Sequence, residues 1–437
     1  MKRFFYSFLK RLSAIRHWLR SHISRSGLLF LVMLLFSAAI GIDTRQNTVS
    51  QFFAILAVLG SISLCFCIRF TARISVIRHL PDFVTAGDPF RYRTLLKNNG
   101  QKTLRNIQAM DTQKWHYPTY PEFCNFKATG KKRAHPFSLA YRWGRLIQYS
   151  RMIRGERQHL PKLSPGTATE LWQECTPLRR GIIRFDSVTF AKSDPFGLFH
   201  ALSSARCMDT LIVLPKRYQV PPVQFSGSRK YQPSGVALAS SVGESQEFRS
   251  MRDYRPGDPP RTIHWRSWAK TGKPMVKEFQ DEYFSRQGLI LDTFSSDCSD
   301  RCFEEAISIA ASFACTVADR DSLLDLLFVG NKAYCFTAGR GVGHSTQLLE
   351  ILATVQQSPS ESFSELPLLI QQRSDLLSSC ICILLAWDKP RQALVADIRA
   401  SGIPVLPLVI SETEVEGKSE PVHYLHPDRI EEGLAQI

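Results

Sequence analysis

The chain has 437 residues, of which 44% are hydrophobic and 22% charged, and its formal net charge is +16. These fractions exclude a disordered chain and fit about two or three globular domains, while the positive charge favours an anionic neighbour, either lipid headgroups or nucleic acid. The eleven cysteines are scattered and form no paired CxxC motifs, which argues against a zinc site and for a reducing compartment.

The N-terminal part predicts a membrane anchor. A basic segment, residues 1–26, carries seven Lys and Arg residues and no acidic residue, and two uncharged apolar runs follow at 27–42 and 48–68. Runs of this length form membrane-spanning helices, the first being marginal. The positive-inside rule puts the N-terminus and everything after residue 69 in the cytoplasm. We therefore expect a two-pass transmembrane hairpin at 27–69 in the plasma (inner) membrane; a signal peptide is the less favoured alternative for the first run.

Residues 70–215 predict a small β-sandwich. Short β-type runs such as 74–77, 90–96 and 181–190 alternate with turn signals. This pattern is typical of a sandwich that is immunoglobulin-like in its general plan.

An insert at 127–162 holds ten Lys and Arg residues against one acidic residue, with aromatic residues between them. Residues 141–154 predict a helix with a basic face. A membrane-surface helix is favoured, because the domain begins close to a predicted span; a solvated basic arm is the next alternative, and nucleic-acid binding is not expected. The candidate membrane-surface residues are Arg142, Trp143, Arg145, Arg151 and Arg154.

The stretch from Gly243 to Glu282, within a linker region at 216–286, interleaves charges with aromatic anchors. We expect a helical turn at 247–252, a turn at 255–258, a short helix at 261–270 and an extended run at 275–279. The stretch is either a clasp between domains or a docking surface for a partner protein, and it holds no nucleophile–base pair. Its candidate residues are Arg252, Tyr254, Arg255, Asp258, Arg261 and Trp265, with Asp258 expected to pair with Arg261.

Residues 287–437 alternate strand and helix patterns, which predicts a doubly wound parallel sheet. Ligands of such sheets bind beyond the carboxyl ends of the strands, where Asp292 lies. The segment Asp292–Ser296 resembles the D-x-S-x-S metal-dependent adhesion site of von Willebrand factor A domains, except that Phe294 replaces the first Ser. That resemblance makes Asp292, Ser296, Thr337 and Asp388 candidate ligands of Mg²⁺. The favoured alternative is a metal-free scaffold in which Asp292 caps a helix or its loop.

The pattern E-F-x-x-x-R-x-Y-x-x-G-D-x-x-R-x-I-x-W-x-x-x-A, from Glu247 to Ala269, resembles the signature of domain-of-unknown-function family 58. An R-R-G block at 179–181 and a D-P-F-G-L turn at 194–198, interpreted as structural, support the resemblance. It implies two membrane helices, a β domain and a von Willebrand A-like domain in a bacterial plasma-membrane protein.

The resemblance also implies a functional setting. Members are commonly encoded beside MoxR-type AAA+ ATPases, and no enzymatic activity is implied. We therefore expect a membrane-tethered adaptor that binds such an ATPase or its client, without a required cofactor. A metal-dependent enzyme, or a magnesium-dependent ligand-binding domain, is the alternative.

Overall fold

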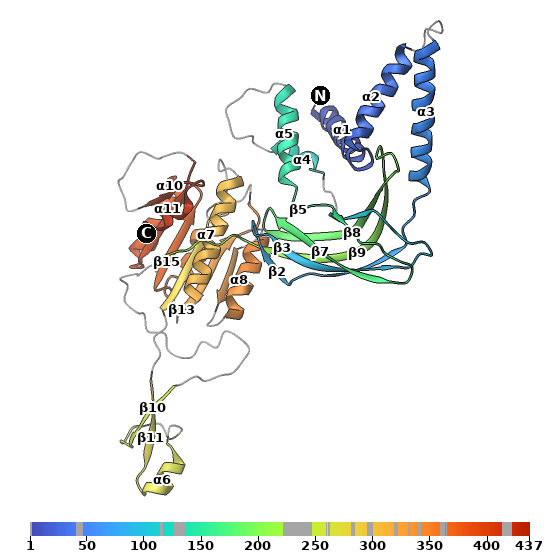
Figure 1. The fold of residues 1–437 in the computed structure, drawn as a ribbon. Helices are drawn as coiled ribbons and strands as arrows, with labels where there is room; N and C mark the ends of the chain where they lie inside the picture. Colours follow the sequence, from blue (N-terminus) through green and yellow to red (C-terminus); the bar gives the residue numbers. More distant parts are fainter. Residues whose placement is uncertain are drawn as a thin grey trace. The chain divides into compact units, whose positions relative to one another are not determined.

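The computed structural model divides into two compact units, Met1–Lys216 and Arg217–Ile437, and each is described by itself (Figure 1). The described residues are 2–40, 47–113, 117–125, 136–221, 247–258, 260, 263–280, 285–294, 300–318, 322–330, 333–338, 342–358, 363, 365–412 and 422–437.

The first unit begins with three helices, α1 (Lys2–His22), α2 (Arg25–Ile40) and α3 (Asn47–Ile68). Within α3, Thr48–Ile68 is long and apolar enough to cross a membrane. The helix α2 is also apolar but has only 16 residues. It lies beside α3 (Figure 1). The two predicted apolar runs therefore both form helices, and one of them has the length of a membrane span.

Two β-sheets follow. The first has the order β1-β3-β7-β5, and the second has the order β2-β9-β8-β4-β6. Their core includes Ile74 and Leu96 from the first sheet and Ile107 and Phe190 from the second, so the two sheets share one apolar layer. The strands are β1 (Ile74–His79), β2 (Phe83–Thr85), β3 (Phe90–Asn98), β4 (Ile107–Gln113), β5 (Ile153–Gly155), β6 (Gln158–His159), β7 (Ala168–Pro177), β8 (Gly181–Ser193) and β9 (His200–Leu214).

Two short helices, α4 (Tyr120–Asn125) and α5 (Pro136–Tyr149), interrupt this β domain. They pack on α1 through Leu9, Phe123, Trp143 and Leu146. The helix predicted at 141–154 ends earlier than expected, at Tyr149, because the chain then enters β5, which pairs with β7.

In the second unit, β10 (Glu247–Asp253) and β11 (Met275–Gln280) form an antiparallel pair, with α6 (Trp265–Thr271) between them. The extended run at 275–279 is confirmed. The helical turn expected at 247–252 is wrong, because these residues pair with β11 along their length. The short helix exists but begins at Trp265.

The remaining chain forms a six-stranded sheet of order β14-β13-β12-β15-β16-β17. Five of its strands are parallel neighbours, whereas β14 is antiparallel to β13. The expectation of a wholly parallel sheet is thus wrong at one edge: only three residues join β13 to β14, and a parallel connection needs a dozen or more. The strands are β12 (Ser285–Leu291), β13 (Ser322–Val329), β14 (Ala333–Ala338), β15 (Ser379–Leu384), β16 (Val405–Ile410) and β17 (His423–Leu425).

Helices cover both faces of this sheet. On one face, α9 (Glu365–Gln371) and α10 (Lys389–Ala400) contribute Leu366 and Leu394 to a core with alternate strand residues such as Ile290. On the other face, α7 (Asp300–Ala318) contacts β12, β13 and β15, and α8 (Val342–Thr354) packs beside it. A last helix, α11 (Ile430–Leu434), contacts β17.

Candidate protein-interaction site

The residues Glu247–Asp258 and Ile263–Gln280 form a compact element that we call the signature hairpin. An ion pair fixes its turn: Arg252 donates from both terminal nitrogens to the two carboxylate oxygens of Asp258, each at 2.7 Å. The backbone N–H of Arg255 also donates to Asp258 at 2.9 Å. These hydrogen bonds, first that of Arg252, lower the pKa of Asp258 from 3.8 to about 2. Asp258 therefore closes the turn as an ionised group.

The structure gives Asp258 a partner that the sequence analysis did not name. The sequence favoured Arg261, which lies outside the described residues, and the structure pairs Asp258 with Arg252 on β10. The bidentate geometry of Arg252 with a carboxylate is the strongest form of this pair. It joins strand to turn, and it was missed because 247–252 was interpreted as helical.

The outer face of the signature hairpin carries aromatic side chains. Trp265 and Trp268 stack with ring centroids 5.3 Å apart and planes inclined by 19°. Trp265 is 63% exposed, and Tyr254 and Arg255 are exposed as well. Exposed Trp, Tyr and Arg residues on a preformed element are the groups that dominate interface energetics.

His264 has a local role in the hairpin. Its Nδ1 lies 2.7 Å from the hydroxyl of Ser267, which also contacts the sulfur of Met251 at 3.2 Å. Ser267 therefore links His264, at the start of α6, to Met251 of β10.

Two of the candidate metal ligands, Asp292 and Asp388, form hydrogen bonds and ion pairs within the fold. Asp292 is fully buried at the end of β12 and accepts hydrogen bonds from the N–H groups of Phe294 and Leu385, both at 3.0 Å. Its second oxygen also accepts from Nε of Arg391 at 2.6 Å. Nη1 of Arg391 bonds Asp388 at 2.6 Å, and Nη2 bonds the carbonyl of Phe294 at 2.9 Å.

Arg391 thus joins Asp292 and Asp388, two of the four predicted ligands. Burial lowers the pKa of Arg391, but the two carboxylates outweigh it and the net shift is upward. A guanidinium therefore already occupies carboxylate oxygens that a cation would need. Asp388 also caps α10 by accepting the N–H of Arg391 at 3.2 Å.

Of the other two predicted ligands, Thr337 lies among the described residues. Thr337 lies opposite Asp325 in the β13–β14 register and accepts from Arg286 at 3.3 Å. Asp325 aligns with Gly288 of β12, away from the end where Asp292 lies. Ser296 is outside the described residues, among which no cluster of three or more His, Cys, Asp or Glu could hold a metal. The described donor set does not fit Mg²⁺.

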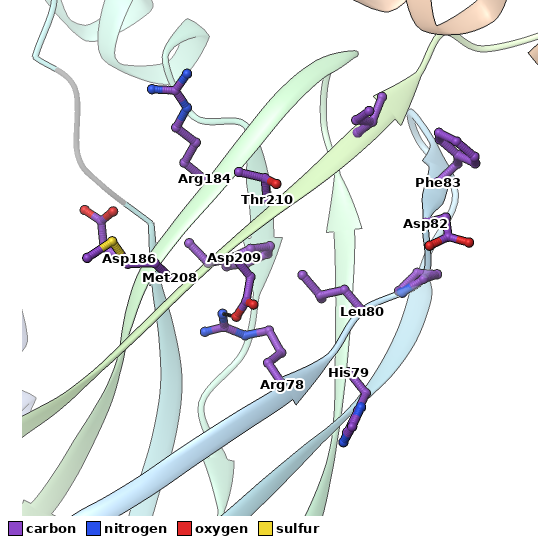
Figure 2. A pocket seen from close by; sticks show the side chains of 13 residues that line it. Arg78, His79, Leu80, Asp82, Phe83, Arg184, Asp186, Met208, Asp209 and Thr210 are labelled. Atoms are coloured by element: carbon purple, nitrogen blue, oxygen red, sulfur yellow. Dashed lines mark hydrogen bonds and ion pairs between the residues drawn. The ribbon is translucent and has the colours of Figure 1, made fainter. Parts of the chain in front are cut away.

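A second buried charge cluster, which the sequence analysis missed, lies in the β domain. Arg78 is fully buried and bonds Asp111 at 2.6 Å and Asp209 at 2.5 Å, with its guanidinium 4.7 Å from the centre of the Phe185 ring. Figure 2 shows Arg78 and Asp209 pointing toward one another beside a cavity of about 910 Å³. The alternation of β1, which places Arg78 on its buried face with Ile74, was the available signal. Because Arg78 pairs with two carboxylates and lies against the Phe185 ring inside the β domain, we interpret the cluster as structural.

The predicted membrane-surface residues divide into two groups. Trp143 is only 4% exposed and packs between α1 and α4, so its placement on a surface is wrong: it is part of the core that holds these helices. Arg142 is half-buried on α5. The remaining residues, Arg145, Arg151 and Arg154, are exposed.

Comparisons with known proteins give one family. The family described as "Protein of unknown function DUF58" matches residues 250–377. Uncharacterized protein YeaD of Bacillus subtilis (strain 168) is 28% identical over 193 residues, which cover 44% of this chain and 47% of YeaD. The chain thus spans about half the length of this curated relative.

Similarity to solved structures is slight. A crystal structure of Salmonella alpha-2-macroglobulin has a TM-score of 0.18 and 14% identity, covering 34% of this chain and 8% of that one. The CARDB domain of a Pyrococcus furiosus protein has a TM-score of 0.16 and 10% identity, covering 32% of this chain and 93% of that domain. Scores this low support no conclusion about the fold.

The family match covers the site described above. It begins at Ser250 in β10 and ends at Leu377, just before β15, so it includes the turn, both tryptophans and the end of β12. Residues 250–377 thus match the model of the DUF58 family of proteins of unknown function, and part of the chain is similar to YeaD.

Proposed function

We propose that this protein is a membrane-tethered adaptor that binds a partner protein through the signature hairpin. The observation that carries the proposal is the exposed Trp265, which stacks on the half-buried Trp268 of α6 in the same hairpin whose turn the Arg252–Asp258 pair closes. A rigid aromatic surface loses little conformational entropy on binding. The partner that the family resemblance suggests is a MoxR-type AAA+ ATPase or its client, bound during assembly or maturation of a protein complex.

The tether in this proposal is the pair α2 and α3. Arg25 is the first residue of α2, and Arg69 and Arg73 follow α3, which supports a hairpin with both chain ends in the cytoplasm. The exposed Arg145, Arg151 and Arg154 are then available to anionic headgroups of the plasma membrane.

The C-terminal sheet is, in this proposal, a von Willebrand A-like domain without its metal. The strand order β14-β13-β12-β15-β16-β17 with an antiparallel edge supports the fold. The Asp292–Arg391–Asp388 arrangement favours metal-independent binding and gives no support to a metal-dependent enzyme. We assign no catalytic activity.

Site-specific photocrosslinking in cells tests the proposal. A photoreactive phenylalanine analogue at Trp265 is expected to capture the ATPase. The same analogue at Trp172 is a matched control, because Trp172 is a 59% exposed tryptophan on β7 of the other unit. Equal capture from both positions, or none from Trp265, would contradict the assignment.

A further inference from the structure

The turn between β8 and β9, Asp194–Phe199, is closed by its own hydrogen bonds. The carboxylate of Asp194 accepts the N–H of Phe199 at 3.0 Å, and the carbonyl of Asp194 accepts the N–H of Gly197 at 3.1 Å. Gly197 has a φ of 69°, a left-handed conformation that favours glycine. The D-P-F-G-L sequence thus encodes a preformed turn at the tip of the long β8–β9 hairpin (Figure 1).

The carbonyls of this turn are bound by the start of α2. The hydroxyls of Ser24 and Ser26 donate to the carbonyl of Gly197 at 2.6 and 2.8 Å, and the N–H of Ser24 donates to that of Leu198 at 3.0 Å. Ser24 also caps α2, since its hydroxyl accepts the N–H of Gly27 at 2.9 Å. A Cβ on Gly27 would lie 2.0 Å from the carbonyl oxygen of Leu198, so only glycine permits this approach.

The same turn also contacts α3. The hydroxyl of Ser63 donates to the carboxylate of Asp194, and both side chains are buried. Ser63 lies five residues before Ile68, the end of α3. At a rise of about 1.5 Å per residue, the contact is about 7.5 Å along the helix from its end. The turn therefore lies beside the last turns of an apolar helix.

The turn exposes the aromatic side chain of Phe196, which is 48% exposed. Exposed apolar residues of both helices are close to the same ends, with Leu28 on α2 and Phe66 on α3. Arg25 and Arg69 flank these ends. An aromatic tip between apolar helix ends and flanking arginines fits the boundary between acyl chains and anionic headgroups.

We infer that the Asp194–Phe199 turn is a membrane-surface joint: Ser24, Gly27 and Ser63 fix the β domain to the tether, and Phe196 inserts into the lipid interface. The inference rests on the proposed membrane insertion of α3. It adds a lipid-contacting site and a function for the D-P-F-G-L block.

The experiment uses the full chain in vesicles of phosphatidylcholine and phosphatidylglycerol, with a photoreactive phenylalanine analogue at one position at a time. The positions are Phe196, Phe66 as the in-membrane reference and Trp172 as the exposed reference outside it. The measured quantity is the yield of lipid adducts by mass spectrometry. We expect the yield at Phe196 to approach that at Phe66 and to exceed clearly that at Trp172.

A yield at Phe196 equal to that at Trp172, with adducts still formed at Phe66, would overturn the inference and leave the tether intact. Loss of adducts at Phe66 would instead overturn the tether, and the inference with it. The Ser63–Asp194 contact is tested by Ser63→Ala, which should reduce adducts at Phe196 but not at Phe66. Ser61→Ala is the matched control, because the exposed Ser61 hydroxyl donates to the carbonyl of Ala57 within its own helix.

Discussion

Arg391 stabilises the buried polar groups at the carboxyl end of β12. Its guanidinium satisfies the carboxylates of Asp292 and Asp388 and the carbonyl of Phe294. The central carbon of the guanidinium, Cζ, also lies 4.8 Å from the centre of the Phe363 ring. A buried carboxylate without a partner is strongly unfavourable, so the role of Arg391 is to make Asp292 tolerable inside the fold.

Replacing Arg391 by Ala should therefore destabilise the C-terminal sheet by about 3–5 kcal/mol, since Asp292 would remain buried and unpaired. Hydrogen exchange of the β12 and β15 amides measures this in the intact protein. Lys389→Ala, at an exposed position of the same helix, should change stability by less than about 0.5 kcal/mol. Added Mg²⁺ should leave wild-type exchange unchanged, and magnesium-dependent protection would contradict our account of this site.

The turn of the signature hairpin has a defined pH dependence. Because the pKa of Asp258 falls from 3.8 to about 2 on folding, its contribution to stability is complete above the unfolded value and is lost as the pH falls through about 2. The carboxyl chemical shift of Asp258 should titrate with a midpoint near 2. An Arg252→Gln variant should return the midpoint toward 3.8. A midpoint already near 3.8 in the wild type would show that the ion pair does not form.

At the scale of single elements, the α2–turn contact depends on one glycine. Gly27→Ala should displace the Asp194–Phe199 turn, because the new Cβ would overlap the carbonyl of Leu198. Faster exchange of the Gly197 and Phe199 amides would report the displacement. Gly144→Ala on α5, where a Cβ meets nothing within 4 Å, should instead be neutral or stabilising by about 0.5–1 kcal/mol. Equal effects of the two substitutions would contradict the close approach.

Elements that local patterns determine could be predicted from the sequence. The strand and helix patterns predicted for residues 287–437 come from continuous apolar runs, such as those of β12 and β15, and from helical periodicity, such as that of α7. Elements that depend on distant partners could not. Residues 247–252 form a strand only because β11, more than twenty residues later, pairs with them, and Trp143 is buried only because α1 packs on α5. The pairing of Asp292 with Arg391 was missed for the same reason, since 99 residues separate them.

At the scale of the whole molecule, the account requires a specific topology. Both apolar helices should cross the membrane, with residues 41–46 outside and the two chain ends in the cytoplasm. Accessibility of single introduced cysteines to a membrane-impermeant reagent in intact cells measures this. Labelling is expected at Gln46 and not at Ile437. Labelling of Ile437 in intact cells would overturn the topology and place the signature hairpin out of reach of a cytoplasmic ATPase.

The central claim is that the signature hairpin binds a partner through the exposed Trp265, which stacks on Trp268. The most direct measurement is the Kd of the purified MoxR-type ATPase for the full chain in vesicles, comparing wild type with Trp265→Ala and Trp172→Ala. Truncating a central aromatic residue of an interface costs about 2 kcal/mol, so Trp265→Ala should raise Kd by about 30-fold. Trp172→Ala should leave it unchanged. No binding by the wild type, or equal Kd values for the two variants, would contradict the account.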